Sequence, residues 1–252
     1  MTIFQNYKLR FNLTNYNQQN FSNLQSFYSI ELDSTEIENY YVMQLDSPII
    51  LIYDKLWNLK NYFSLNGKRT FTFNFYNYLY VSAANWGILK YDKYFNLIKS
   101  NSRSLWYRGI YYNYTNGLIN VASYDTKIGV DIFDQNLTLV GNISTSGINP
   151  YSLTEYNGML VVSDFKSGKI TFFKNSTRVK TVNTLCTNVF TILIDSLNNY
   201  MSLLCKPNIY LYHINGSFTG IVLTTCSSPS FMKFDSFGRL IVTCSSEIDI
   251  LY

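Results

Sequence analysis

Residues 151–175 read YSLTEYNGMLVVSDFKSGKITFFKN. The turn Asn157-Gly158 precedes the apolar run Leu160–Ser163, and a polar segment separates that run from Phe172-Phe173. Short runs of β-branched and aromatic residues, bounded by Asn, Gly, Ser and Lys, are typical of β-strands joined by tight turns. The stretch therefore predicts consecutive short strands rather than helices.

The same pattern recurs along the whole chain. Each period contains an apolar run that ends in an aromatic residue and is followed by a polar turn; these aromatic markers are Tyr53, Tyr91, Phe133, Phe173 and Tyr212. The markers are separated by 38, 42, 40 and 39 residues, and turns rich in Asn and Gly keep the same phase. A period of this length with four short strands is typical of one blade of a β-propeller.

The two ends of the chain predict how the ring of blades closes. Tyr252 lies 40 residues after the marker Tyr212, and Phe4 begins a segment that matches a marker with its following outer strand. Counting marker intervals from Phe4 to Tyr252 gives six. We therefore predict an all-β, six-bladed β-propeller of four-stranded blades, in which an N-terminal strand completes the last blade and leaves no open blade at the seam.

These intervals also predict the boundaries along the chain. Residues 1–252 form a single β-propeller domain, and residues 1–14 hold the outer strand that closes blade six. The six blades are expected at about 24–66, 67–104, 105–146, 147–184, 185–225 and 226–252.

Two segments, Asp235–Val242 and Tyr151–Asp164, resemble the blades of the NHL-type family of six-bladed β-propellers. A blade of that family carries an Asp-x-x-Gly turn followed by a strand similar to Ile-Tyr-Val-Ala-Asp. The resemblance covers nearly the whole chain, although the Asn and Arg that the family places before the third strand are mostly missing. It implies the fold, and it implies a family made mostly of binding platforms with some enzymes.

Composition excludes several classes of protein. Charged residues make up 14% and aromatic residues 17% of the 252 residues, which excludes a disordered, collagenous or coiled-coil chain. The net charge of +4 is spread along the sequence, so no nucleic-acid partner is predicted. No uninterrupted apolar stretch reaches the roughly 18 residues of a spanning helix, so we expect no membrane insertion by this chain. Without a signal-peptide pattern, the chain is either cytosolic or a monomeric domain of a longer secreted or membrane-anchored protein.

The four cysteines fall at repeat-equivalent places. Cys186 and Cys226 precede the inner strands of blades five and six, and Cys205 and Cys244 end the second strands of those blades. Because these places lie on the same face of a blade, symmetry favours the disulfides Cys186–Cys205 and Cys226–Cys244. The alternative is four reduced, buried cysteines in a cytoplasmic protein.

Asn-x-Ser/Thr sequons are the second indication of compartment. Seven occur, at Asn12, Asn20, Asn113, Asn136, Asn142, Asn175 and Asn215. Chance alone predicts about 5 in a chain this rich in Asn, Ser and Thr. Together with the predicted disulfides, the sequons favour an extracellular or cell-surface glycoprotein, with a cytoplasmic protein as the alternative.

Catalytic chemistry has little support in the sequence. The single histidine, His213, takes a surface-turn slot that other blades fill with Asp54, Asp92, Asp134 and Lys174, so no Ser-His-Asp arrangement is predicted at the centre of the ring. Four acids recur between second and third strands: Asp46, Asp125, Asp164 and Glu247. They indicate either side chains that accept hydrogen bonds from nearby backbone N–H groups in turns, which we favour, or a cation site. We predict no catalytic residue, no metal ligand and no cofactor.

The best candidate site is aromatic. Trp86 follows a second strand and Trp106 precedes the next inner strand, and both loops open on the same face in neighbouring blades. The candidate ligand-binding residues are Trp86, Trp106, Tyr107, Arg108, Tyr124 and Asp125. Aromatic rings with polar neighbours suit a sugar ring or a peptide side chain. Alternatively, the two Trp side chains fill the wedge-shaped space between blades.

The sequence therefore favours a non-catalytic binding or adhesion module, an extracellular domain that recognises a protein or a glycan through the face bearing Trp86 and Trp106. One alternative is a metal-dependent lactonase or hydrolase with the same fold, because some propellers that resemble the gluconolactonase group hold calcium on their inner strands. The other is a purely structural module.

Overall fold

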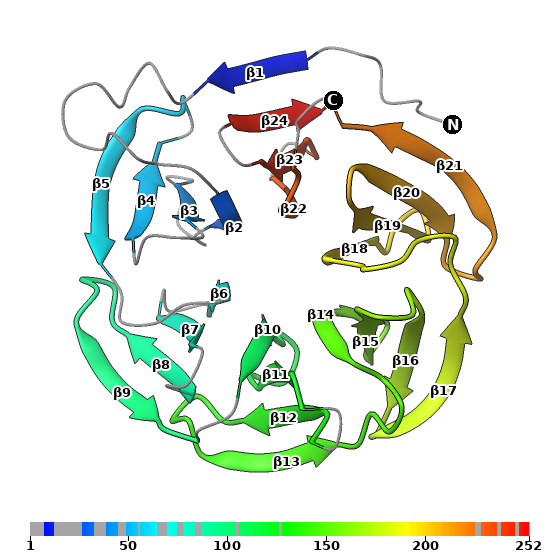
Figure 1. The fold of residues 1–252 in the computed structure, drawn as a ribbon. Helices are drawn as coiled ribbons and strands as arrows, with labels where there is room; N and C mark the ends of the chain where they lie inside the picture. The colour runs from blue at the N-terminus through cyan, green and yellow to red at the C-terminus, as the bar shows by residue number, and fades with distance from the viewer. Residues whose placement is uncertain are drawn as a thin grey trace.

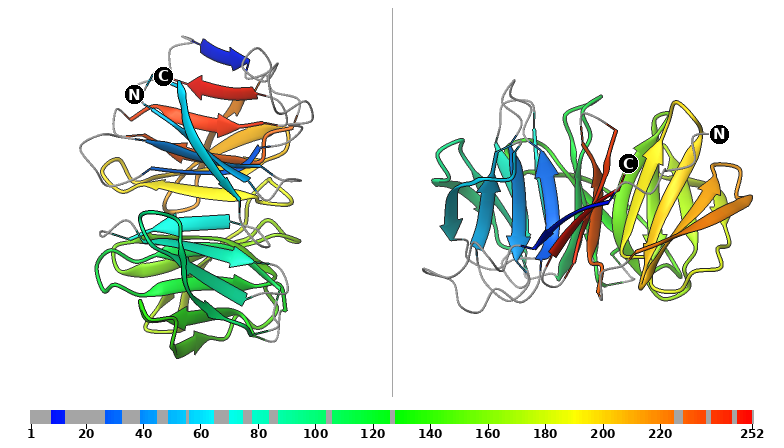
Figure 2. Two further views of the ribbon diagram at one scale, coloured as in Figure 1. Left: turned by 90° about the vertical axis from the view of Figure 1, so that its left-hand side faces the viewer. Right: turned by 90° about the horizontal axis from the view of Figure 1, so that it is seen from above.

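The computed structural model describes residues 39–44, 49–54, 56–64, 70–74, 78–83, 87–103, 106–125, 128–224, 228–235, 238–244 and 247–251, and the backbone alone of 8–12 and 27–32. In these ranges 24 strands form six four-stranded antiparallel sheets, arranged as blades around a centre (Figure 1). Seen from the side, the blades lie next to one another in a single layer and form a disc (Figure 2).

Each of the first five blades is a meander whose strands run in chain order from the centre outward. Blade one contains β2 (Phe27–Leu32), β3 (Tyr40–Gln44), β4 (Ile49–Tyr53) and β5 (Leu59–Ser64). Blade two contains β6 (Thr70–Phe73), β7 (Leu79–Ala83), β8 (Gly87–Tyr91) and β9 (Leu97–Asn101). Blade three contains β10 (Tyr107–Tyr112), β11 (Ile119–Ser123), β12 (Val130–Phe133) and β13 (Leu139–Ile143). Blade four contains β14 (Pro150–Tyr156), β15 (Met159–Asp164), β16 (Ile170–Lys174) and β17 (Thr177–Val182). Blade five contains β18 (Thr191–Asp195), β19 (Tyr200–Cys205), β20 (Asn208–His213) and β21 (Phe218–Leu223).

The sixth blade is assembled from both ends of the chain. Its three inner strands are β22 (Phe231–Phe234), β23 (Leu240–Thr243) and β24 (Glu247–Leu251), and its outer strand is β1 (Lys8–Asn12). β1 pairs with β24 in antiparallel register, with Lys8 opposite Leu251 and Asn12 opposite Glu247 (Figure 1). The pairing joins the first described strand to the last blade and covers the edge of β24.

The core lies between the blades. Six apolar clusters are present among the described residues, and each joins two neighbouring blades. Adjacent residues of one strand point to opposite faces of a sheet, so Tyr40 packs against blade six while Tyr41 packs against blade two. Because both faces of each blade are buried, the second strands read as apolar runs and the chain has few places for charge.

The aromatic markers are part of this core. Tyr53, Tyr91, Phe133, Phe173 and Tyr212 are all buried, and each lies at or next to the last residue of a third strand. The repeat phase read from the sequence is therefore the phase of the third strands.

In blades one, two, three and five, the first side chain of the polar turn after the marker accepts a backbone N–H group. Oδ1 of Asp54 accepts hydrogen bonds from the backbone N–H groups of Leu56 and Asn58, both at 2.9 Å. The side-chain amide of Asn58 donates to the same carboxylate and holds the pKa of Asp54 below its ordinary value. His213 takes this slot in blade five, where its Nδ1 accepts the N–H of Asn215 at 3.2 Å. The single histidine therefore lies in a turn, as the sequence predicts, and its ring nitrogen accepts a backbone N–H group there.

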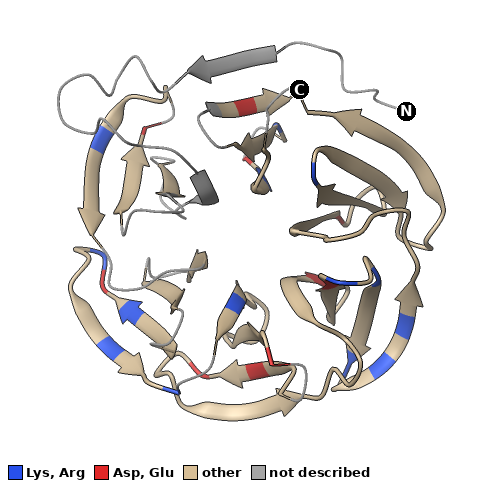
Figure 3. Ribbon diagram, viewed as in Figure 1, with Lys and Arg blue, Asp and Glu red and all other residues tan. Residues whose placement is uncertain are grey.

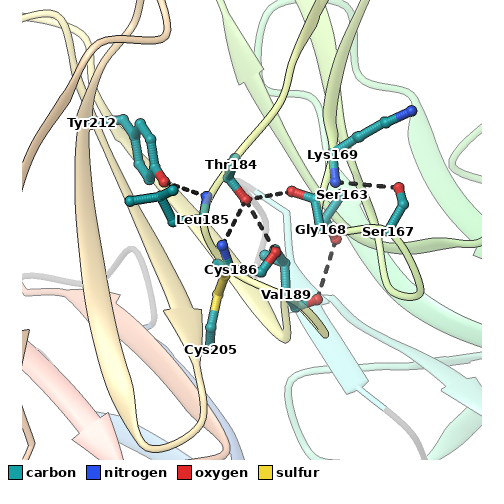
Figure 4. The surroundings of a disulfide bond; sticks show 10 residues. All are labelled: Ser163, Ser167, Gly168, Lys169, Thr184, Leu185, Cys186, Val189, Cys205 and Tyr212. Carbon is teal, nitrogen blue, oxygen red and sulfur yellow. Dashed lines mark hydrogen bonds between the residues drawn. A yellow bond between two sulfur atoms is a disulfide. The ribbon is translucent and has the colours of Figure 1, made fainter.

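A disulfide joins Cys186 to Cys205 across 19 residues, as repeat symmetry predicts (Figure 4). The loop before β18 is held further by Oγ1 of Thr184, which donates to the carbonyl of Gly168 at 2.6 Å, and by the N–H of Leu185, which donates to Oη of Tyr212 at 2.7 Å. Cys226 lies outside the described residues, so the pair Cys226–Cys244 stays a prediction. No helix in the described part of the chain is long and apolar enough to span a membrane.

Candidate ligand-binding face

One face of the ring carries the connections into the inner strands and the turns between second and third strands; we call it the loop face. In blade three the two kinds of segment touch, because the N–H of Tyr124, directly after β11, donates to the carbonyl of Trp106, directly before β10, at 2.7 Å. The predicted neighbours therefore share a face. Trp86 lies outside the described residues.

Three of the candidate residues gather at this point. The side chains of Trp106 and Tyr124 are 49% and 39% exposed, with ring centroids 6.2 Å apart. Cζ of Arg108 lies 4.0 Å from the centroid of the Tyr124 ring. A guanidinium this close to an aromatic face makes a cation–π contact. The structure thus brings Trp106, Arg108 and Tyr124 together as an exposed platform.

Tyr107 has a different position. Its side chain is fully buried, and its Oη donates to Oδ2 of Asp131 at 2.5 Å. The buried carboxylate of Asp131 also accepts Nη1 of Arg103 at 2.9 Å and the amide of Asn142 at 3.0 Å. Burial, together with this carboxylate, raises the pKa of Tyr107, so its hydroxyl remains a donor. Tyr107 therefore supports the platform from inside the blade and is not on the exposed surface.

The recurring acids make turn contacts where they are described. The carbonyl of Asp125 accepts the N–H groups of Ile128 and Gly129, at 3.0 and 3.3 Å. Oδ1 of Asp164 accepts the N–H groups of Asn149 and Lys166, at 3.2 and 3.1 Å. Asp46 and the side chain of Glu247 lie outside the described residues. Within the described ranges no group of three or more His, Cys, Asp or Glu side chains comes together.

The platform continues into two neighbouring blades through residues that the sequence does not single out. Arg108, Tyr151 and Phe190 hold equivalent positions at the starts of the inner strands of blades three, four and five, and Tyr124, Phe165 and Lys206 each follow a second strand directly. Each blade stacks its own pair. The rings of Tyr151 and Phe165 lie 4.8 Å apart, and Nζ of Lys206 lies 4.8 Å from the centroid of Phe190.

The three pairs also touch one another. Cζ of Arg108 lies 4.8 Å from the ring of Tyr151 and 5.0 Å from that of Phe165. Phe190 packs edge-on against both rings, at 5.7 Å from Tyr151 and 5.4 Å from Phe165. We call this continuous set the aromatic row: Trp106, Arg108, Tyr124, Tyr151, Phe165, Phe190 and Lys206. Its turn positions 124, 165 and 206 are each 41 residues apart, which is the signal in the sequence that would have found them.

The aromatic row borders a cavity at the centre of the ring. The cavity has a volume of about 70 Å³ and lies among the inner strands β6, β10, β14, β18 and β22. Each of these strands carries at most one charged residue (Figure 3). Two cationic side chains, Arg108 and Lys233, line the cavity together with Tyr151, Phe190 and Phe231. None of the described lining residues is acidic.

Comparison with known proteins supports the architecture. The WD40 β-propeller domain of Doa1 superposes with a TM-score of 0.69 over 90% of this chain and 78% of that chain. The chain is a six-bladed β-propeller. At 13% sequence identity the likeness to that propeller shows the fold alone. No protein-family model and no curated protein matches the sequence. The NHL-type resemblance is thus supported at the level of the propeller fold.

Proposed function

We propose that this propeller is a non-catalytic binding module that recognises a protein or a glycan through the aromatic row and Trp86 on the loop face. The observation that carries the proposal is the continuous contact of rings and cations across three blades, with Trp106 and Tyr124 left substantially exposed. Fold alone does not select a function. Exposed Trp, Tyr and Arg on a rigid frame are the residues that dominate binding energy at interfaces.

The frame under the aromatic row supports this function. The disulfide ends at Cys205, directly before Lys206, and at Cys186, four residues before Phe190. In blade three, the bond from Tyr107 to Asp131 fixes the start of β10, beside Trp106 and Arg108. A surface ordered before binding loses less conformational entropy when the ligand arrives. The same module is proposed to act as a monomeric domain of a longer protein.

The first test removes the exposed rings. Ligands are first selected by screening the immobilised chain against a glycan array and a displayed library of random peptides. Trp106→Ala and Tyr124→Ala are each expected to weaken binding of a selected ligand at least about 30-fold, the usual effect of removing a hot-spot ring. The midpoint of thermal unfolding should shift little, because both side chains are substantially exposed.

Tyr94→Ala is the matched control. Tyr94 is 71% exposed and lies in the turn between the third and outer strands of blade two, on the opposite face. Its removal should leave binding unchanged. If Trp106→Ala instead causes a large loss of thermal stability, Trp106 acts as filler between blades and the proposed site is wrong.

We further propose that the protein is extracellular or on the cell surface. The disulfide supports this location, because disulfides persist mainly in oxidising compartments. Three sequon residues, Asn136, Asn175 and Asn215, are exposed in turns before outer strands, on the face opposite the aromatic row. Glycans there would leave the loop face open to a ligand.

The sequons are expected to differ in occupancy. The side-chain amide of Asn142 donates to the carbonyl of Ile128 at 2.7 Å and to Oδ1 of Asp131 at 3.0 Å, so a glycan there breaks bonds of the folded state. In folded protein secreted from animal cells behind a signal peptide, peptide mapping should find glycans on Asn136, Asn175 and Asn215, with Asn142 unmodified. Full occupancy of Asn142, or none at the other three, would contradict the proposal.

A further inference from the structure

The charged residues among the described lining residues of the central cavity are all cationic. Arg108 and Lys233 both line it, and no acid is present among its described lining residues. The charged residues Glu155 and Asp195 of the inner strands β14 and β18 lie toward the other ends of those strands. The cavity, with a volume of about 70 Å³, is large enough to admit a carboxylate group with its methylene stem.

Arg108 is held beside the cavity by aromatic rings. Its Cζ lies between 4.0 and 5.0 Å from the centroids of Tyr124, Tyr151 and Phe165. A guanidinium carries its N–H donors in a planar fork that matches the two oxygens of a carboxylate. Arg108 therefore belongs both to the aromatic row and to the cavity.

The other walls suit an acidic side chain. Phe190 and Phe231 provide apolar surface for the methylene stem. Thr191 also lines the cavity, and its buried hydroxyl has no hydrogen-bond partner among the described residues. Buried hydroxyl groups are normally hydrogen-bonded, and a bound carboxylate is an acceptor that could satisfy this one.

We propose that the ligand is an acidic peptide, which inserts one Asp or Glu side chain into the cavity beside Arg108 and Lys233 and lays flanking apolar or aromatic side chains on the aromatic row. This inference rests on the proposed function, since it uses the same face. It names the class of ligand, with a carboxylate as the anchoring group and the rings of the row as the contact surface.

The experiment begins with selection of 12-residue linear peptides from a random displayed library against the immobilised full chain. Enriched peptides are expected to share an Asp or Glu next to a large apolar residue. Replacing that acid in a synthetic peptide, Glu→Gln or Asp→Asn, should weaken binding at least about tenfold, because a charge-assisted hydrogen bond is lost. Arg108→Gln and Lys233→Gln should each weaken the parent peptide similarly and have little further effect on the amide peptide.

Lys99→Gln is the matched control, because Lys99 lies exposed on the outer strand β9, far from the cavity. It should leave peptide binding unchanged and thereby separate a local effect from a change in net charge. Arg108→Lys keeps the charge but removes the planar donor fork, so it should recover only part of the affinity. Thermal unfolding of each variant checks that the protein used in the binding measurement is folded.

The outcomes separate this inference from the function on which it rests. Peptides that require Trp106 or Tyr124 but bind equally well with Gln in place of Glu would overturn the acidic anchor and leave the binding face standing. Array glycans that depend on Trp106, with no peptide enriched, would overturn the peptide class alone. Neither peptide nor glycan binding to the loop face would overturn both proposals.

Discussion

Gly168→Ala is expected to lower the free energy of unfolding by about 3 kcal/mol or more. Gly168 has a φ of +70°, and a Cβ added to it would lie 1.6 Å from the carbonyl oxygen of Cys186. That oxygen belongs to the loop held by the disulfide and by Thr184, so it cannot move aside easily (Figure 4). The measurement is urea or thermal unfolding; for a domain of this size the midpoint should fall by about 6–12 °C.

Gly158→Ala in the same blade is the matched control. Gly158 has nearly the same φ, +71°, but a Cβ there would meet nothing within 4 Å. Its substitution should therefore cost only the left-handed backbone strain of about 1–2 kcal/mol. Equal losses at the two positions would show that the close approach of the loop before β18 contributes nothing to stability.

The architecture was predictable because the repeat is a periodic signal with a physical cause. In blades one to five a buried aromatic residue lies at or next to the end of the third strand, and in blades one, two, three and five the first side chain of the following turn accepts a backbone N–H group. Asp54 accepts with a carboxylate oxygen and His213 with a ring nitrogen, yet both residues lie at the same position of the repeat. The intervals between markers therefore count blades, even though no family model recognises the sequence.

The aromatic excess has two sources that sequence reading separates only in part. Trp57 stacks on Tyr40 with ring centroids 4.3 Å apart and lies in the cluster between blades one and six. This is the inter-blade role that was the alternative for the other two Trp residues. Trp106 differs, because it precedes an inner strand at the loop face and is half exposed.

The extent of the site was the part that the sequence could not give directly. Tyr107 and Arg108 are neighbours in one strand, so their side chains diverge, one into the core and one onto the loop face. The positions equivalent to Arg108 hold Tyr151 and Phe190, and the cation of the stacked pair moves from inner strand to turn between blades three and five. The stacked positions recur in blades three, four and five, but the residue types at those positions change. A sequence search by residue type therefore misses the part of the aromatic row in blades four and five.

Asp131→Ala is expected to destabilise the protein by about 3 kcal/mol, because it removes the acceptor at the centre of a buried cluster. The carboxylate is 1% exposed and accepts hydrogen bonds from Tyr107 and Asn142 as well as from Arg103. Without the Asp131 carboxylate, the buried hydroxyl of Tyr107 has no acceptor. This unsatisfied buried donor accounts for most of the expected loss in the free energy of unfolding. The side chain of Arg103 is 40% exposed and its guanidinium can turn to water, so the broken ion pair itself adds little to the loss of stability.

A double-mutant cycle with Tyr107→Phe isolates this mechanism. Tyr107→Phe alone should cost about 1–2 kcal/mol, because Asp131 keeps its other two donors. In the presence of Asp131→Ala, the same change should cost nothing or restore stability, since the stranded hydroxyl is removed. Additive losses of stability in urea unfolding would show that the two side chains do not interact.

The same pair of variants should also affect ligand binding. Because Tyr107 anchors the strand between Trp106 and Arg108, Asp131→Ala should weaken binding at the loop face. The double variant Asp131→Ala/Tyr107→Phe should recover stability more fully than it recovers binding.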